Sequence, residues 1–134
     1  MSEHPHQVHA QLPAPAADYA VSLQARGHRF VSDEPQDKGG HDVGARPFEL
    51  ALAGLASCTA ITIRMYAQRK QWPLKDVRVE LTHDADDVTY RMNRKIELVG
   101  DLTAEQKQYL LGIANKCPIH RALHKKFEIS TVLS

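Results

Sequence analysis

The stretch PFELALAGLASCTAITIRMYAQRK, residues 47–70, predicts one long helix around which the rest of the chain is organised. Pro47 suits the first helical turn, and Arg69 and Lys70 suit the negative end of the helix dipole. Apolar side chains occupy every face of this helix, which is typical of a helix buried on all sides. A chain of 134 residues has too few other elements to bury every face of this helix, so we expect a second copy of the chain to cover the remaining faces. The alternative is a central helix that packs under a single sheet.

The segments on either side of this helix predict an α+β domain. Alternating apolar residues indicate strands, and the pattern Thr103-Ala104-Glu105-Gln106 indicates a capping box at the start of a second helix. The expected strands cover residues 19–23, 28–32, 77–81, 88–92, 96–98 and 127–131, and the expected shorter helices cover residues 103–115 and 118–125. Residues 33–44 predict a long irregular loop. Residues 1–18 predict a flexible N-terminal arm, which leaves a single domain over residues 19–134.

The composition narrows the class of protein. The formal charge is +1, and the basic residues are scattered, so we expect no nucleic-acid partner. Arg64 interrupts the longest apolar stretch, so we expect no membrane span. The first twenty residues lack the apolar core of a signal sequence. The two cysteines therefore favour a cytoplasmic, reducing compartment, in which a disulfide is more often transient and catalytic than structural.

Cys58 lies in the middle of the long apolar helix. Apolar neighbours at helical spacing raise the pKa of a thiol, so Cys58 requires a nearby cation before it can act as a nucleophile. A guanidinium suits this task because it does not lose its charge. Arg26, Arg29 and Arg46 precede the helix and are the candidates. The alternative is a cysteine that only fills space in the core.

Cys117 follows 59 residues later and has the opposite setting. Lys116 precedes it and Pro118 follows it, so we expect Cys117 at the N-terminal edge of a short helix whose dipole favours a thiolate. By local sequence alone, Cys117 is the more acidic thiol. His120 and His124 complete a spacing that is also found in zinc sites, but no fourth ligand is evident, so we expect neither a metal nor another cofactor.

Glu49 lies in the first turn of the long helix, where a carboxylate favours the helix dipole. In a buried helix it also needs a cationic partner. Nine residues separate it from Cys58, which places the two about 180° apart and roughly 13 Å along the axis of one straight helix. We therefore expect that, if they serve one site, Glu49 comes from the second copy of a dimer.

Two motifs stand in a fixed order in this chain: residues 47–50 (PFEL) lead into residues 56–59 (ASCT), and residues 116–120 (KCPIH) follow the second helix. Together they resemble the OsmC/Ohr family of thiol peroxidases over about residues 19–134, and most closely its broader OsmC-like branch. The resemblance implies an α+β fold, an intertwined homodimer whose antiparallel sheets wrap around long central apolar helices. It also implies that both active sites lie at the dimer interface.

The resemblance further implies a mechanism and residue roles. Cys58 corresponds to the peroxidatic cysteine, which attacks a hydroperoxide and becomes a sulfenic acid, and Cys117 to the resolving cysteine that closes a disulfide. Glu49 corresponds to a glutamate that positions an arginine near the reactive sulfur; Arg26 is our first candidate for that arginine and Arg29 the second. An external dithiol, a lipoyl group in part of the family, then restores the thiols.

A second function is compatible with the same residues. A dimer of this fold could bind an apolar ligand or sense oxidants without turnover, with the two cysteines serving as a switch or as packing. Sustained consumption of hydroperoxide separates the enzyme from such a binding or sensing protein.

Overall fold

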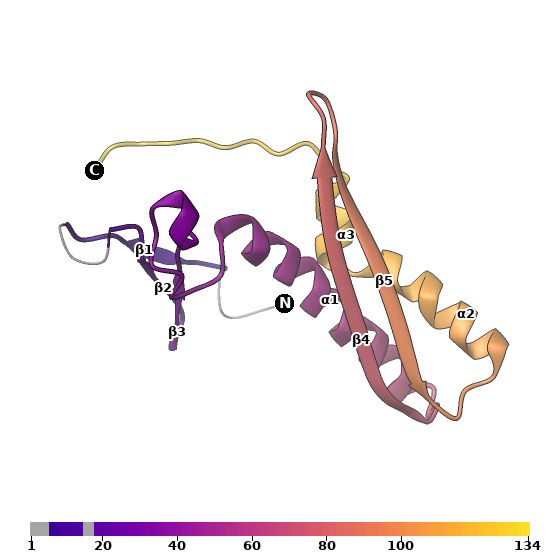
Figure 1. The fold of residues 1–134 in the computed structure, drawn as a ribbon. Helices are drawn as coiled ribbons and strands as arrows, with labels where there is room; N and C mark the ends of the chain where they lie inside the picture. The colour runs from indigo at the N-terminus through magenta and orange to yellow at the C-terminus, as the bar shows by residue number, and fades with distance from the viewer. Residues whose placement is uncertain (1–5, 15–17) are drawn as a thin grey trace. The chain divides into compact units, whose positions relative to one another are not determined.

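The structure is a computed structural model that describes residues 6–14 and 18–134. The chain forms two compact units, Met1–Ala51 and Leu52–Ser134, and the boundary between them falls inside the long helix. Figure 1 gives the order of the elements along the chain. The fold is mixed helix and sheet, with two antiparallel sheets and three α-helices in the described residues, as the sequence predicts. The expected division into an arm (1–18) and one domain (19–134) stays a prediction.

The first unit contains a three-stranded antiparallel sheet in the order β1-β2-β3. Strands β2 (Val21–Ala25) and β3 (His28–Ser32) form the expected hairpin. Strand β1 (His9–Gln11) pairs with β2, so part of the predicted arm carries regular structure. The long loop that follows contains the 3-10 helix η1 (Gln36–Lys38) and is organised by Asp33, whose carboxylate accepts three backbone N–H bonds, from Glu34, His41 and Val43.

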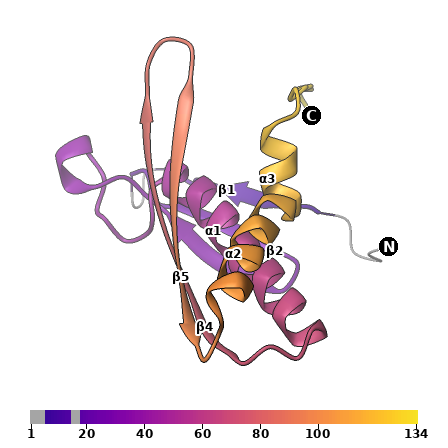
Figure 2. The same cartoon turned by 90° about the vertical axis from the view of Figure 1, so that its right-hand side faces the viewer.

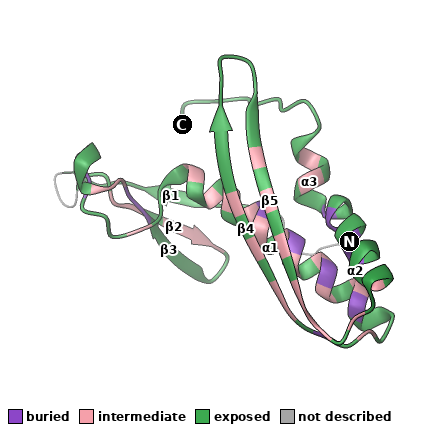
Figure 3. Ribbon diagram, turned by 45° about the vertical axis from the view of Figure 1, so that its right-hand side comes forward, coloured by how far each residue is buried: buried purple, intermediate pink, exposed green. Residues whose placement is uncertain are grey.

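Helix α1 (Pro47–Arg69) ends one residue before the predicted boundary. Its buried residues repeat every four positions and so form one stripe along the helix, which Figure 3 shows in purple. These residues are Leu55, Thr59, Ile63 and Ala67. On the other side Ile61 and Met65 are 55% and 57% exposed. A single copy therefore covers only one face of the apolar helix.

The length and composition of α1 decide whether this helix could span a membrane. The helix is long and apolar enough to cross a bilayer, and Arg64 does not prevent this. The core helix of a soluble protein passes the same test, so the finding is weak evidence for a span. The expected absence of a membrane span stays a prediction.

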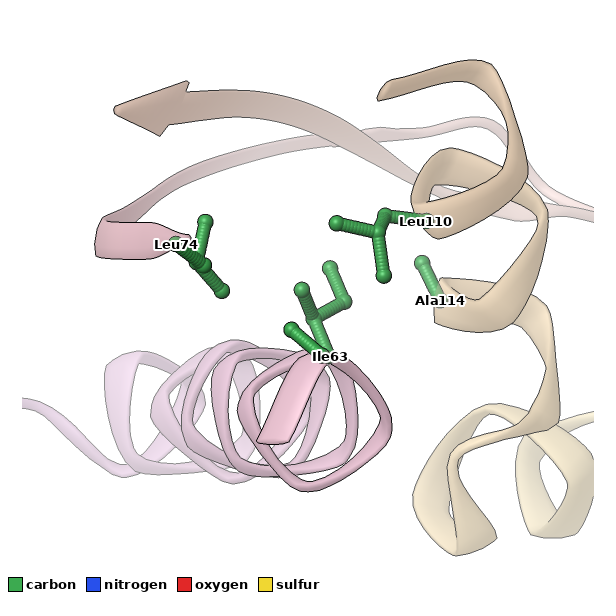
Figure 4. Packing of buried hydrophobic residues seen from close by; sticks show 5 residues of the cluster. Ile63, Leu74, Leu110 and Ala114 are labelled. Carbon is green, nitrogen blue, oxygen red and sulfur yellow. The ribbon is translucent and has the colours of Figure 1, made fainter. Parts of the chain in front are cut away.

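The second unit consists of the rest of α1, a long hairpin and two further helices (Figure 2). The hairpin is made of β4 (Leu74–Ala85) and β5 (Tyr90–Gly100). The two strands expected at 88–92 and 96–98 are thus one continuous strand, β5, which begins only at Tyr90 because Val88 belongs to the turn. The core gathers side chains from α1, β4 and α2 (Ala104–Ile113), including Ile63, Leu74 and Leu110 (Figure 4).

The elements that hold Cys117 follow α2. Thr103 and Gln106 form the predicted capping box at the start of α2, each side chain bonding the other residue's backbone N–H group. The chain then tightens into the 3-10 helix η2 (Ala114–Lys116), passes Cys117 and enters α3 (Pro118–Leu123).

The C-terminal segment departs from the prediction. The strand expected over residues 127–131 is absent, since residues 126–134 form neither helix nor strand. A strand needs a neighbouring edge, and neither sheet of the described chain pairs with this segment. Its apolar side chains remain largely exposed, with Ile129 at 87% and Val132 at 92%.

Candidate active site

The fold brings the two cysteines together, although 59 residues separate them in the sequence. Cys58 is half-buried on α1, and Cys117 is fully buried between η2 and α3. The backbone N–H of Ile119 donates to Cys58 Sγ over 3.5 Å, and the next N–H, that of His120, donates to Cys117 Sγ over 3.2 Å. Two successive amides at the start of α3 therefore hold the two sulfur atoms side by side, both as free thiols.

The surroundings of Cys58 within its own chain do not favour a thiolate. Burial raises the pKa of Cys58; the Ile119 N–H bond lowers it, the adjacent Cys117 thiol raises it, and the Thr62 hydroxyl lowers it. The net direction is upward, as an apolar helix predicts. Cys58 therefore needs a cation from elsewhere to ionise readily.

Cys117 occupies the position that its sequence predicts. It is the N-cap residue of α3, with an extended backbone (φ −65°, ψ 142°), and Pro118 occupies the first turn of the helix. Its thiol replaces the usual Ser, Thr, Asp or Asn oxygen as the acceptor for the N–H three residues later. The same turn thus caps a helix and presents a sulfur to α1.

Arg94 on β5 is a site residue that the sequence analysis missed. Its Nη1 donates to Thr59 Oγ1 over 2.9 Å and to Ala114 O over 3.4 Å, and its Nη2 donates to Asn115 Oδ1 over 2.9 Å. The signal in the sequence is the two-residue period of β5, because Arg94 takes an inward position that Met92 and Ile96 share. An arginine in that row requires hydrogen-bond acceptors, which residues beside the two cysteines supply.

His120 also contacts Arg94, with Nδ1 lying 3.3 Å from Arg94 Nη2. Burial lowers the pKa of His120, and the charges of Arg94 and His124 lower it further. The neutral ring accepts the Arg94 hydrogen bond at Nδ1, which places its proton on Nε2. The His124 ring lies 4.7 Å away, centroid to centroid.

A cavity of about 320 Å³ opens beside this cluster. Arg94, His120 and His124 form its polar part, and Leu55, Met92 and Leu123 supply much of the apolar part. A small apolar molecule with one polar group matches this lining in size and chemistry. Every lining residue belongs to the second unit.

Glu49 and the three predicted arginines belong to the first unit. Glu49 is exposed, and its Oε1 accepts a 2.8 Å hydrogen bond from the Arg46 backbone N–H, which caps the start of α1. Arg26 lies in the turn between β2 and β3 with a positive φ of 55°, and its side chain is exposed. The roles predicted for Glu49 and Arg26, with Arg29 as second choice, stay predictions.

The zinc alternative finds no support in the part of the chain that the structure describes. No group of three or more His, Cys, Asp or Glu residues there is arranged to hold a metal ion. His120 instead turns Nδ1 toward the Arg94 guanidinium, a cation.

Comparisons with known proteins agree with this architecture. The family model described as OsmC-like protein matches residues 39–132, which include both cysteines, Glu49 and Arg94. The chain belongs to the OsmC-like family. No curated protein sequence matches it significantly.

Several solved structures share this fold. A putative osmotic stress induced and detoxification response protein from Psychrobacter arcticus has 18% identity and a TM-score of 0.75, with 92% of this chain and 91% of that chain covered. An organic hydroperoxide resistance protein OsmC from Legionella pneumophila has 18% identity and a TM-score of 0.65, with 92% of each chain covered. OhrB, the organic hydroperoxide resistance protein of Bacillus subtilis, has 20% identity and a TM-score of 0.61, with 92% and 93% covered. At these identities the likeness establishes the fold.

Proposed function

We propose that this protein is a cysteine-based peroxidase that reduces organic hydroperoxides, and hydrogen peroxide as a further substrate, to alcohols or water. The observation that carries the proposal is the apposition of Cys58 and Cys117, whose sulfur atoms accept hydrogen bonds from adjacent amides. The family supports it, because some of its members are named for organic hydroperoxide resistance. In this proposal the protein acts in the cytoplasm as part of an antioxidant, oxidative stress response.

The chemistry assigned to the thiols proceeds in three steps. The Cys58 thiolate attacks the terminal oxygen of the hydroperoxide, the O–O bond breaks, and the alcohol leaves after taking up a proton. Cys58 is then a sulfenic acid. The Cys117 thiol attacks that sulfur, an S–S bond forms, and the oxygen leaves as water. An external dithiol, a lipoyl group in our proposal, reduces the disulfide by thiol–disulfide exchange.

A homodimer forms part of this proposal. The α1 face that includes Ile61 and Met65 is exposed in one copy, and so are the apolar residues of the C-terminal segment 126–134. A second copy would bury both surfaces. It would also allow Glu49 and Arg26 of one copy to serve Cys58 of the other, which a single straight helix does not allow for Glu49.

The second candidate is a redox-sensing or apolar-ligand-binding dimer of the same fold, which consumes no peroxide in repeated cycles. The upward pKa direction at Cys58 favours it, since a protonated thiol reacts slowly with peroxides. The cavity beside Arg94, whose lining is partly apolar, is a suitable ligand site for such a protein.

The deciding experiment measures turnover of the reduced protein with cumene hydroperoxide and with hydrogen peroxide, using dihydrolipoamide as the reductant. We expect rapid turnover with the organic peroxide, complete loss in Cys58→Ser, and loss of recycling through a disulfide in Cys117→Ser. Absence of turnover with both oxidants in the wild-type protein would reject the enzyme in favour of the binding or sensing candidate.

A further inference from the structure

The guanidinium of Arg94 connects the two segments that carry the cysteines. On one side it bonds Thr59, the residue after Cys58, whose side chain is fully buried and itself donates to Leu55 O over 2.7 Å. On the other side it bonds Ala114 and Asn115, which precede Cys117. All these contacts lie within the second unit.

His120, on the far side of Cys117, supplies a further acceptor for Arg94 at Nδ1. Arg94 therefore forms hydrogen bonds to the turn around Cys117 at both of its ends, to Asn115 and to His120. The same guanidinium also bonds Thr59 on α1. The acceptors are a hydroxyl, a carbonyl, an amide oxygen and a ring nitrogen, none of which carries a negative charge. The planar fork of an arginine can reach acceptors on both sides at once, whereas the ammonium of a lysine is a single point.

We propose that Arg94 is a positioning residue that holds the Cys117 turn against α1, and so sets the ease with which Cys58 and Cys117 form a disulfide. A disulfide demands Cβ atoms about 3.8 Å apart and a narrow range of dihedral angles. A turn that is free to move samples this arrangement less often, which lowers the effective concentration of one thiol at the other. The inference rests on the proposed function only for its catalytic consequence.

That consequence concerns the second step of the proposed reaction. The Cys117 sulfur attacks the Cys58 sulfenic acid; the S–S bond forms, the S–O bond breaks, and the departing hydroxide takes the Cys117 proton to leave as water. Cys117 is oxidised and the sulfenic sulfur is reduced, so the step needs no additional oxidant. Arg94 touches neither reacting group in the described contacts, and it acts by keeping the turn in place.

The test is the disulfide equilibrium of the whole protein in mixtures of reduced and oxidised dithiothreitol, read by trapping free thiols with a maleimide. In Arg94→Met we expect the equilibrium constant for the Cys58–Cys117 disulfide to fall about tenfold, which is about 30 mV for a two-electron couple. Arg94→Lys should lose nearly as much, because it keeps the charge without the fork. Arg91→Met is the matched control, since Arg91 lies on the same strand and pairs with Asp84 and Asp86. It should leave the constant unchanged.

A milder substitution tests the same contact in case Arg94→Met does not fold. Asn115 is exposed, and Asn115→Ala removes one acceptor of Arg94 while leaving the arginine in place. We expect a fall of about two- to threefold, consistent with one weak hydrogen bond. Wild-type constants in folded Arg94→Met or in Asn115→Ala would overturn the proposal. A wild-type constant in Arg94→Lys would also overturn it, because charge alone would then suffice.

The two steps of the reaction give a further readout. In a Cys117→Ser background, Arg94→Met should leave the rate of Cys58 sulfenic acid formation unchanged, whereas in the two-cysteine protein it should slow disulfide closure. An equal slowing of both steps would overturn the positioning role. The dithiothreitol equilibrium needs no peroxide, so failure of the peroxidase proposal and failure of this one are separate results.

Discussion

The two units of the chain differ in how much of the proposed chemistry they complete. Residues 52–134 bring together both cysteines, the amides that bond them and Arg94. Residues 1–51 carry Glu49 and the candidate arginines, and there Glu49 bonds the backbone of Arg46 three residues away. The residues that take part in the proposed disulfide step therefore all lie within one unit. Activation of Cys58, in contrast, depends on a cation that this unit does not bring to the sulfur in its described contacts.

We expect the greatest loss of peroxidase activity from a substitution in residues 1–51, at Glu49. In Glu49→Gln the amide oxygen can still accept the Arg46 N–H bond, so the start of α1 should persist, but the charge that would orient an arginine is lost. We expect peroxidase turnover to fall about a hundredfold, which is typical when a reacting group is misplaced. The measurement is the rate of cumene hydroperoxide consumption at saturating dihydrolipoamide.

Asp37→Asn is the matched control for this change. Asp37 is an exposed carboxylate of the same unit, in η1, and its neutralisation alters the net charge equally. It should retain wild-type turnover. A wild-type rate of turnover in Glu49→Gln would mean that Glu49 serves only as a cap of α1. It would then give no reason to place Glu49 of the second copy at the site.

The pH dependence of Cys58 alkylation tests whether Glu49 brings a cation to this thiol. The chain's own surroundings, burial above all, raise the pKa of Cys58, so the thiol stays protonated at neutral pH and reacts faster as the pH rises. If an arginine oriented by Glu49 faces Cys58 in the dimer, the midpoint in the wild-type protein falls below the ordinary thiol value of about 8.5. In Glu49→Gln it should return above that value.

Peptide-resolved mass spectrometry after brief iodoacetamide treatment of the reduced protein measures this midpoint for Cys58 separately from Cys117. The expected difference between wild type and Glu49→Gln is about one pH unit or more, the size commonly produced by one nearby opposite charge. Identical midpoints in the two proteins would mean that no cation dependent on Glu49 reaches the sulfur.

The sequence alone predicted those features whose causes are local. The extent of α1, the capping box at Thr103 and the helix start at Cys117 depend mainly on local sequence, and all three are confirmed. The two cysteine side chains lie close together, whereas the redox roles that the family resemblance implies for them stay predictions. The strand expected over residues 127–131 is wrong because a strand depends on an edge elsewhere, which its own pattern cannot reveal.

Arg94 shows the same limit at the site. Its alternation with Met92 and Ile96 was visible in the sequence, but its acceptors come from α1 and from the turn around Cys117. Nothing in residues 90–100 indicates that those two segments meet beside β5. The role of Glu49 is harder still, because it depends on the placement of a whole unit or of a second copy.

A substitution in the capping box of α2 distinguishes the stability of residues 52–134 from the positioning of the Cys117 turn, and we expect it to have only a modest effect. Thr103→Ala removes the hydroxyl that accepts the Gln106 N–H over 3.0 Å and so opens the capping box of α2. The free energy of unfolding should fall by about 1 kcal/mol, measured by urea denaturation of the reduced protein. Gln108→Ala, on the exposed side of the same helix, should change it by less than about 0.5 kcal/mol.

The disulfide equilibrium of Thr103→Ala decides what this loss means. Because Arg94 holds the Cys117 turn directly, weakening the far end of α2 should leave the equilibrium constant in dithiothreitol at its wild-type value. A fall as large as that in Arg94→Met would show that the turn depends on the general stability of α2. The apposition of the two thiols would then be a property of the whole second unit, and Arg94 would be one contact among many.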